Sequence, residues 1–177
     1  RVDLARPLRG RVIVLDPGHP PLGACGPTAL CEPEVTLAVA RLAAERLRAA
    51  GARVTLTRSD AGPVGLWPRV ALADSLGAEL LVSIHLNAFP DGINPFVNNG
   101  SSTFFQHPQA IGLAQLVQRQ LVSRLGLRDL GIARGDGTQV TESLTRNADR
   151  PDAEAFAGGG LVGGFGVGTQ AGDDGGG

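Results

Sequence analysis

The sequence predicts a single α/β domain, built from a mostly parallel or mixed twisted sheet with helices on both faces. Short apolar runs recur along the chain, and between them lie segments whose apolar residues have helical spacing. Strands that alternate with helices favour a sheet that is covered on both faces. A chain of 177 residues, 42% of them hydrophobic, can bury one substantial core, which fits one domain.

The first half of the chain contains the clearest alternation. Its predicted elements are a strand at 11–15, a helix at 34–50, a strand at 52–57, a helix at 66–76 and a strand at 80–85. Gly51 is expected to end the first helix, because glycine readily adopts the backbone conformation found just after a helix. Pro, Gly, Asp and Asn residues fill the segment 89–100, and this composition predicts a loop.

The second half is less regular. A strand is expected at 101–105 and a helix at 108–125, which begins at Pro108 because the fixed φ of proline suits the first helical position. After Gly131 the pattern weakens, and 11 of the 20 residues from 158 to 177 are Gly. Ordering so much glycine costs much backbone entropy, so we expect a tail of uncertain structure there, in the simplest case a flexible one.

Two histidines, His19 and His85, each follow a short apolar run that is predicted to form a buried strand. Ligands of α/β sheets bind outside the carboxyl ends of the strands, so these two imidazoles can converge although they are far apart in sequence. Together with Glu32 they form a set of two histidines and one carboxylate, which holds zinc and leaves a fourth position for water or substrate. We therefore predict His19, Glu32 and His85 as metal ligands. Glu34 is assigned to the first turn of the helix, where a carboxylate favours the macrodipole.

Two cysteines, Cys25 and Cys31, lie six positions apart in a segment rich in Gly and Pro. A small disulfide ring is sterically feasible at this spacing and would fit an oxidising compartment. Two reduced thiols are an alternative, and zinc ligation is a third, because Cys31 adjoins Glu32.

The formal net charge of −1 gives no indication of nucleic-acid binding. No apolar run reaches the length of a membrane span, so no transmembrane segment is expected. We expect the chain to be a monomer.

The ordered motifs of the chain resemble those of the zinc-dependent N-acetylmuramoyl-L-alanine amidases, which are cell-wall hydrolases. That family carries D-P-G-H after its first strand and S-x-H-x-N-A after a later one. Between them it has a ligand glutamate before a helix, in the form E-x-x-x-[NT]-L. The matching segments here are DPGH at 16–19, EPEVTL at 32–37 and SIHLNA at 83–88. The resemblance spans roughly residues 10 to 130, and several motifs in the same order are far more specific than any one of them.

The resemblance implies a cofactor and a catalytic residue. The cofactor is Zn²⁺, held by His19, Glu32 and His85, and zinc in such a set polarises a carbonyl and lowers the pKa of water toward about 7. A further glutamate near the C-terminus of the family takes the water proton and passes it to the leaving amine. Its best match here is Glu142, in the segment 140–144, and Glu154 is the competing candidate.

By the same resemblance, the substrate is peptidoglycan, and the bond cut joins the lactyl group of N-acetylmuramic acid to L-alanine. Residues 1–9 are then interpreted as a linker from a longer precursor, residues 10–157 as the zinc amidase catalytic domain, and residues 158–177 as a Gly-rich tail. Export to the periplasm or cell envelope follows from the substrate, and an activating or recruiting protein is left unidentified. Two alternatives stay open: a catalytically impaired module of the same fold that binds cell wall or a partner, and a zinc peptidase.

Arg58 and Arg69 have two interpretations at this stage. They are expected to form structural ion pairs with the nearby Asp60 or Asp74, and contact with substrate is the alternative.

Overall fold

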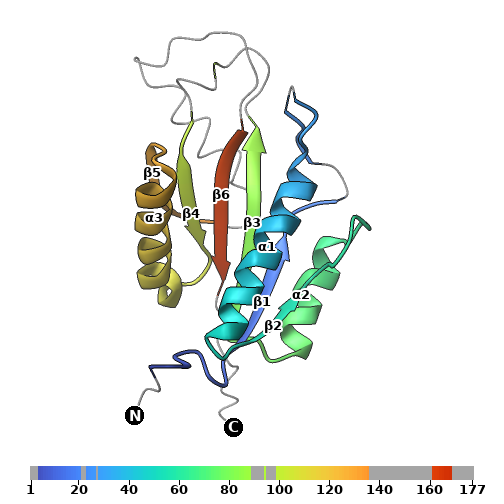
Figure 1. Cartoon of the computed structure of the whole chain (residues 1–177), viewed down its shortest axis with the longest axis vertical. Helices are drawn as coiled ribbons and strands as arrows, with labels where there is room; N and C mark the ends of the chain where they lie inside the picture. The colour runs from blue at the N-terminus through green and yellow to red at the C-terminus, as the bar shows by residue number, and fades with distance from the viewer. Residues whose placement is uncertain are drawn as a thin grey trace.

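The computed structural model describes residues 4–20, 23–26, 28–88, 94, 99–135 and 161–168. Within these residues, a six-stranded sheet with the strand order β2-β1-β3-β6-β4-β5 forms the centre of the molecule (Figure 1). The elements in chain order are β1 (Val12–Pro17), α1 (Glu32–Ala49), β2 (Arg53–Leu56), α2 (Leu66–Ser75), β3 (Leu80–Ala88), β4 (Ser101–Phe105), the 3₁₀ turn η1 (Pro108–Ala110), α3 (Ile111–Leu125), β5 (Asp129–Arg134) and β6 (Leu161–Gly168).

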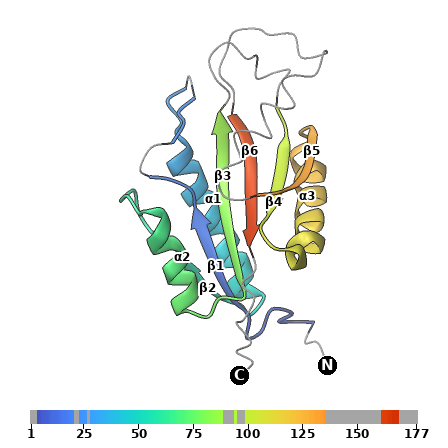
Figure 2. The same cartoon turned by 180° about the vertical axis from the view of Figure 1, so that it is seen from behind.

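The sheet is mixed. Strand β1 pairs in parallel with both β2 and β3, whereas β6 runs antiparallel to β3 and parallel to β4, and β5 is parallel to β4. Helices α1 and α3 lie over one face and α2 over the other, as the two opposite views show (Figures 1 and 2). The predicted fold class, one α/β domain with helices on both faces of a mixed sheet, is therefore confirmed.

Strand β1 is apolar from Val12 to Leu15 because both faces of the sheet are covered there. Ile13 and Leu15 pack in one core cluster with Ala40 and Ala44 of α1. Val14 points to the opposite face and packs in a second cluster, to which Ala73 of α2 belongs. The alternation follows from the strand geometry, in which successive side chains point to opposite faces.

The strands and helices predicted up to residue 125 are all present, with shifted ends. Helix α1 begins at Glu32 and not at residue 34, since Pro33 is well tolerated in the first helical turn. Strand β3 continues to Ala88, three residues beyond the predicted end. The predicted helix from Pro108 is divided into a 3₁₀ turn and α3, and α3 ends at Leu125, directly before Gly126, whose φ is +64°. Among the described helices, none combines the length and apolar composition that a membrane span requires.

The expectation of a flexible tail over 158–177 is wrong for residues 161–168. These residues form β6, which is inserted between β3 and β4 near the middle of the sheet. Glycine has a low strand propensity, and the local sequence therefore gave no strand signal. Backbone pairing with two neighbouring strands, distant in sequence, overrides that propensity and makes the segment part of the domain.

Candidate metal centre

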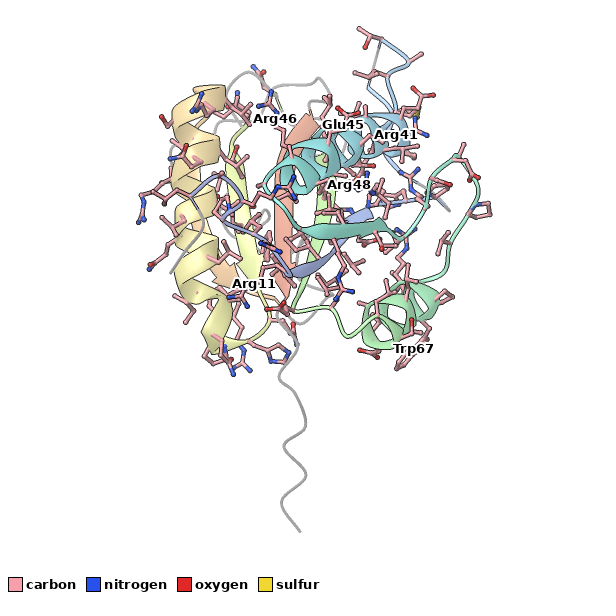
Figure 3. All side chains as sticks on the ribbon, turned by 60° about the horizontal axis from the view of Figure 1, so that its bottom comes forward. Arg11, Arg41, Glu45, Arg46, Arg48 and Trp67 are labelled. Carbon is pink, nitrogen blue, oxygen red and sulfur yellow. A yellow bond between two sulfur atoms is a disulfide. The ribbon has the colours of Figure 1, made fainter. Side chains whose placement is uncertain are left out.

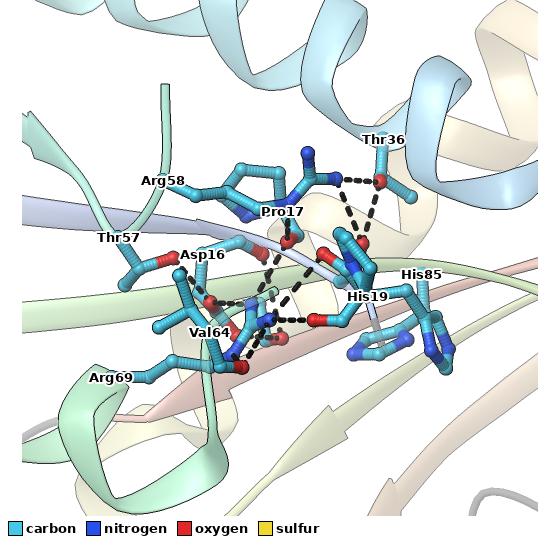
Figure 4. A network of polar contacts seen from close by, with 12 residues as sticks. Asp16, Pro17, His19, Thr36, Thr57, Arg58, Val64, Arg69 and His85 are labelled. Carbon is cyan, nitrogen blue, oxygen red and sulfur yellow. Dashed lines mark hydrogen bonds and ion pairs between the residues drawn. The ribbon is translucent and has the colours of Figure 1, made fainter. Parts of the chain in front are cut away.

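The carboxyl ends of β1 and β3 bring the two predicted histidines together. In the parallel register Pro17 lies opposite Ile84, and the Gly18 N–H donates to the Ile84 carbonyl at 2.8 Å. His19 follows in the loop after β1, and His85 is the next residue along β3. Their ring centroids are 5.2 Å apart, with the ring planes at 85°. The two imidazoles therefore face the same space (Figure 4).

Gly18 makes this arrangement possible, because the His85 ring lies against its backbone. A Cβ atom at Gly18 would come within 2.4 to 2.8 Å of three atoms of the His85 ring. Any side chain there would force the imidazole away, so the glycine of the D-P-G-H segment is required by the position of His85.

Glu32 joins the two histidines. Its Oε2 lies 3.3 Å from His19 Nε2 and its Oε1 lies 3.1 Å from His85 Nδ1. The Leu86 N–H donates to the same Oε1 at 2.9 Å, and the residue is only 3% exposed. Glu32 is also the first residue of α1, where the helix dipole favours a negative charge.

The environment of Glu32 keeps its carboxylate charged. Burial alone would raise the pKa of Glu32, but the hydrogen bonds from His85 and from the Leu86 N–H, with the charges of His19 and His85, outweigh it and lower the pKa. An ionised carboxylate is the form that ligates a metal.

Three predicted ligands therefore meet in one place. One donor atom from each of His19, Glu32 and His85 lies within 4.8 Å of the others, and this is the one such cluster among the described residues. Two imidazole nitrogens and one carboxylate oxygen are donors that zinc prefers, and three protein ligands leave a position open. The residues fit a zinc ion. Glu34, which was assigned to the helix terminus, is exposed in the same first turn.

The two candidates for the general base, Glu142 and Glu154, lie outside the described residues. Their assignment rests on the sequence alone.

Cys25 and Cys31 form a disulfide, with the Cα atoms 4.0 Å apart. Of the three alternatives for these cysteines, the structure has the bridge, and neither sulfur joins the histidine cluster. The bridge closes a short loop directly before Glu32, whose N–H donates to the Ala24 carbonyl at 2.8 Å.

A buried polar network lies beside the cluster and contains Asp16, a residue of the D-P-G-H motif for which the sequence predicted no role of its own (Figure 4). Asp16 forms an ion pair with Arg69 at 2.6 Å and accepts hydrogen bonds from Thr57 and Ser83. The expected pairing of Arg69 with Asp60 or Asp74 is therefore wrong. A charged residue at the end of an apolar strand is the signal that could have identified Asp16, since a buried charge needs a partner.

Asp16 is charged at neutral pH. Burial would raise the pKa of its carboxyl, but hydrogen bonds from Thr57, Ser83 and Arg69, together with the positive charge of Arg69, hold that pKa below its ordinary value.

Arg58 also differs from expectation. Its Nη1 donates to the Asp60 backbone carbonyl at 2.9 Å, and its Nε and Nη2 donate to three more backbone carbonyls and to the Thr36 hydroxyl. Arg58 and Arg69 are 4% and 5% exposed, so neither side chain is open to a substrate.

Residues 13–152 match the N-acetylmuramoyl-L-alanine amidase family. The N-acetylmuramoyl-L-alanine amidase LytC of Bacillus subtilis is 38% identical over 136 residues, which cover 73% of this chain and 26% of LytC. The uncharacterized protein YqiI of the same species is 35% identical over 145 residues, which cover 78% of this chain and 68% of YqiI. The chain thus spans about a quarter of LytC and about two thirds of YqiI.

Solved structures of amidases also superpose on this chain. An N-acetylmuramoyl-L-alanine amidase from Clostridium difficile 630 superposes with a TM-score of 0.65 at 25% identity, covering 89% of this chain and 77% of that one. The CwlD amidase of Clostridioides difficile, solved in complex with the GerS lipoprotein, superposes with a TM-score of 0.61 at 20% identity, covering 90% and 82% of the two chains. The second likeness concerns the fold alone.

Proposed function

The chain belongs to the N-acetylmuramoyl-L-alanine amidase family, and we propose that it hydrolyses the amide bond between N-acetylmuramic acid and L-alanine in peptidoglycan, with zinc as cofactor. The observation that carries the proposal is the convergence of His19, Glu32 and His85 at the carboxyl ends of β1 and β3. These three side chains would hold the ion. A zinc ion in this set supplies a Lewis acid that polarises the scissile carbonyl and makes water more acidic.

The remaining steps are the attack of water on the amide and the transfer of its proton. The water oxygen forms a bond to the lactyl carbonyl carbon, and the bond from that carbon to the L-alanine nitrogen breaks. A general base must remove the water proton, and the same group can then give it to the departing amine. We assign this role to Glu142, with Glu154 as the alternative, because the sequence around Glu142 best matches the context of the family glutamate.

The identity of the bond cut tests the proposal. Purified, uncrosslinked muropeptides digested with the zinc-loaded protein should release the stem peptide whole, with a new free amine on L-alanine, as mass spectrometry with amine labelling would detect. A new amine on any other stem residue would identify a zinc peptidase. Binding to peptidoglycan without any new amine would support the impaired module. Either result would refute the amidase proposal.

We also infer that the protein acts in the cell envelope, in the periplasm or outside the membrane, because peptidoglycan is found there. The Cys25–Cys31 disulfide supports this, since such bridges persist in oxidising compartments. Protein recovered from the envelope fraction, denatured without reductant and titrated for thiols, should contain no free sulfhydryl, and two after reduction. Two reactive thiols before reduction would refute the bridge, and recovery from the cytoplasmic fraction alone would refute the location.

A further inference from the structure

We propose that Arg58 and Arg69 are positioning residues for the metal centre, which hold the His19 loop and the first turn of α1 so that His19 and Glu32 keep one geometry before a metal binds. The proposal rests on the metal site proposed above. Both arginines donate to the backbone that carries the candidate ligands, and they act through that backbone.

Arg69 holds the loop from the side of α2. Its Nη1 donates to Asp16 Oδ1 at 2.6 Å and to the Pro17 carbonyl at 3.0 Å. Its Nη2 donates to the carbonyls of His19 at 3.3 Å and Pro20 at 3.0 Å. One guanidinium therefore fixes the backbone on both sides of the His19 side chain, and the Asp16 carboxylate fixes that guanidinium in turn.

Arg58 joins the same loop to α1. Its Nε donates to the Pro17 carbonyl at 2.9 Å and its Nη2 to the Gly18 carbonyl at 3.0 Å. The same Nη2 donates to the Pro33 carbonyl at 2.7 Å and to the Thr36 hydroxyl at 3.1 Å, both in the first turns of α1. Thr36 completes the connection, because its hydroxyl donates to the Gly18 carbonyl at 2.9 Å. The segment before His19 and the helix start that carries Glu32 are thus tied to one side chain.

The backbone conformation of His19 shows why such support is needed. Its φ is +54°, in the left-handed region that residues other than glycine seldom adopt. A conformation of this kind persists where the surrounding contacts determine it. Between them, the two arginines bind the carbonyls of all four residues from 17 to 20. This network, seen beside the histidine rings in Figure 4, holds His19 in that conformation.

Arginine suits this task better than lysine does. The planar guanidinium presents five N–H donors in fixed directions, whereas the lysine ammonium has three donors on one atom. A lysine would keep the positive charge but could not reach carbonyls on both sides of the loop. Substitution by lysine therefore removes the positioning and leaves the charge.

A merely structural role makes a different prediction. If a variant lowers the free energy of unfolding but the metal-free protein is still folded, zinc binds without a folding step. The zinc affinity of such a variant is unchanged. If a variant loosens the His19 loop, zinc binding must also order that loop. The entropy lost in this ordering lowers the zinc affinity. Zinc affinity, measured on folded metal-free protein, separates the two roles.

The test compares Arg58→Lys and Arg69→Lys with the wild-type full chain. Zinc affinity of the metal-free protein is measured by competition with a chromophoric chelator, and folding is checked by thermal melting of the same samples. We expect each variant to bind zinc about 10- to 100-fold more weakly, the range seen when groups that orient metal ligands are replaced. Wild-type affinity in both folded variants would overturn the proposal.

Arg48→Lys is the matched control. Arg48 also donates from its Nη2 to a backbone carbonyl, that of Val54, at 2.7 Å. It lies near the other end of α1, about 24 Å along the helix axis from Glu32 at 1.5 Å per residue, and Figure 3 shows it on the side of β2. We expect unchanged zinc affinity. A loss equal to that of the other two variants would assign the effect to general arginine packing and overturn the proposal.

The Thr36→Val variant tests the positioning role in a second way, which applies where a lysine variant fails to fold. It keeps the branched shape of the side chain and removes the hydroxyl that links Arg58 to the Gly18 carbonyl. Weaker zinc binding in folded Thr36→Val protein supports the proposal, and wild-type affinity contradicts it. Wild-type protein that binds no stoichiometric zinc would refute the metal site itself, a result distinct from any difference among the variants.

Discussion

Replacing His85 by alanine is expected to abolish zinc binding and amide hydrolysis together. His85 supplies one of the three converging donors, and its ring also contacts the buried Glu32 carboxylate at 3.1 Å. Two remaining ligands cannot complete the set of three that catalytic zinc sites use. Zinc content by atomic spectroscopy should fall from stoichiometric to background, and amine release from muropeptides should fall to the rate of the metal-free protein.

His107→Ala is the control for this variant. His107 is exposed at the start of η1 and does not belong to the cluster of donors. The His107→Ala protein should retain both its zinc and its amidase activity. Stoichiometric zinc in purified His85→Ala protein would count decisively against the ligand assignment.

Replacing Glu142 by glutamine is expected to separate catalysis from metal binding. Glutamine cannot accept the water proton, and the loss of a positioned proton-transfer group costs on the order of a hundredfold or more in rate. Zinc should stay bound, because Glu142 is not a proposed ligand. The measurement is kcat on muropeptides, together with zinc content of the same sample.

Glu154→Gln is the companion variant, since it makes the same change at the competing position. If it loses the rate while Glu142→Gln retains it, the role of general base belongs to Glu154. Full activity in both variants would show that neither glutamate is the base.

The ligand set could be predicted because its determinants are local. Each histidine comes after an apolar run, His19 just beyond β1 and His85 within β3, and the parallel pairing of β1 with β3 places the two side by side. Glu32 follows the loop and begins a helix, which is also a local property. The sequence placed its helix start two residues late, since the signals of helix starts leave an uncertainty of that size.

The polar network could not be predicted in the same way. Arg69 binds Asp16, which is 53 positions away in the chain, and the nearer Asp60 instead accepts a hydrogen bond from the Gly62 N–H. Sequence proximity favoured the wrong partner, because the partner of a buried charge depends on which strands lie together. Strand β6 could not be predicted for the same reason, because its pairing with β3 and β4 is a property of the assembled sheet.

Anomalous diffraction at the zinc absorption edge, from crystals of the full chain grown with zinc, tests the central claim most directly. We expect one strong peak with a nitrogen of His19, an oxygen of Glu32 and a nitrogen of His85 at about 2.0 to 2.2 Å. Zinc bound elsewhere, with these three side chains free of metal, would contradict the account.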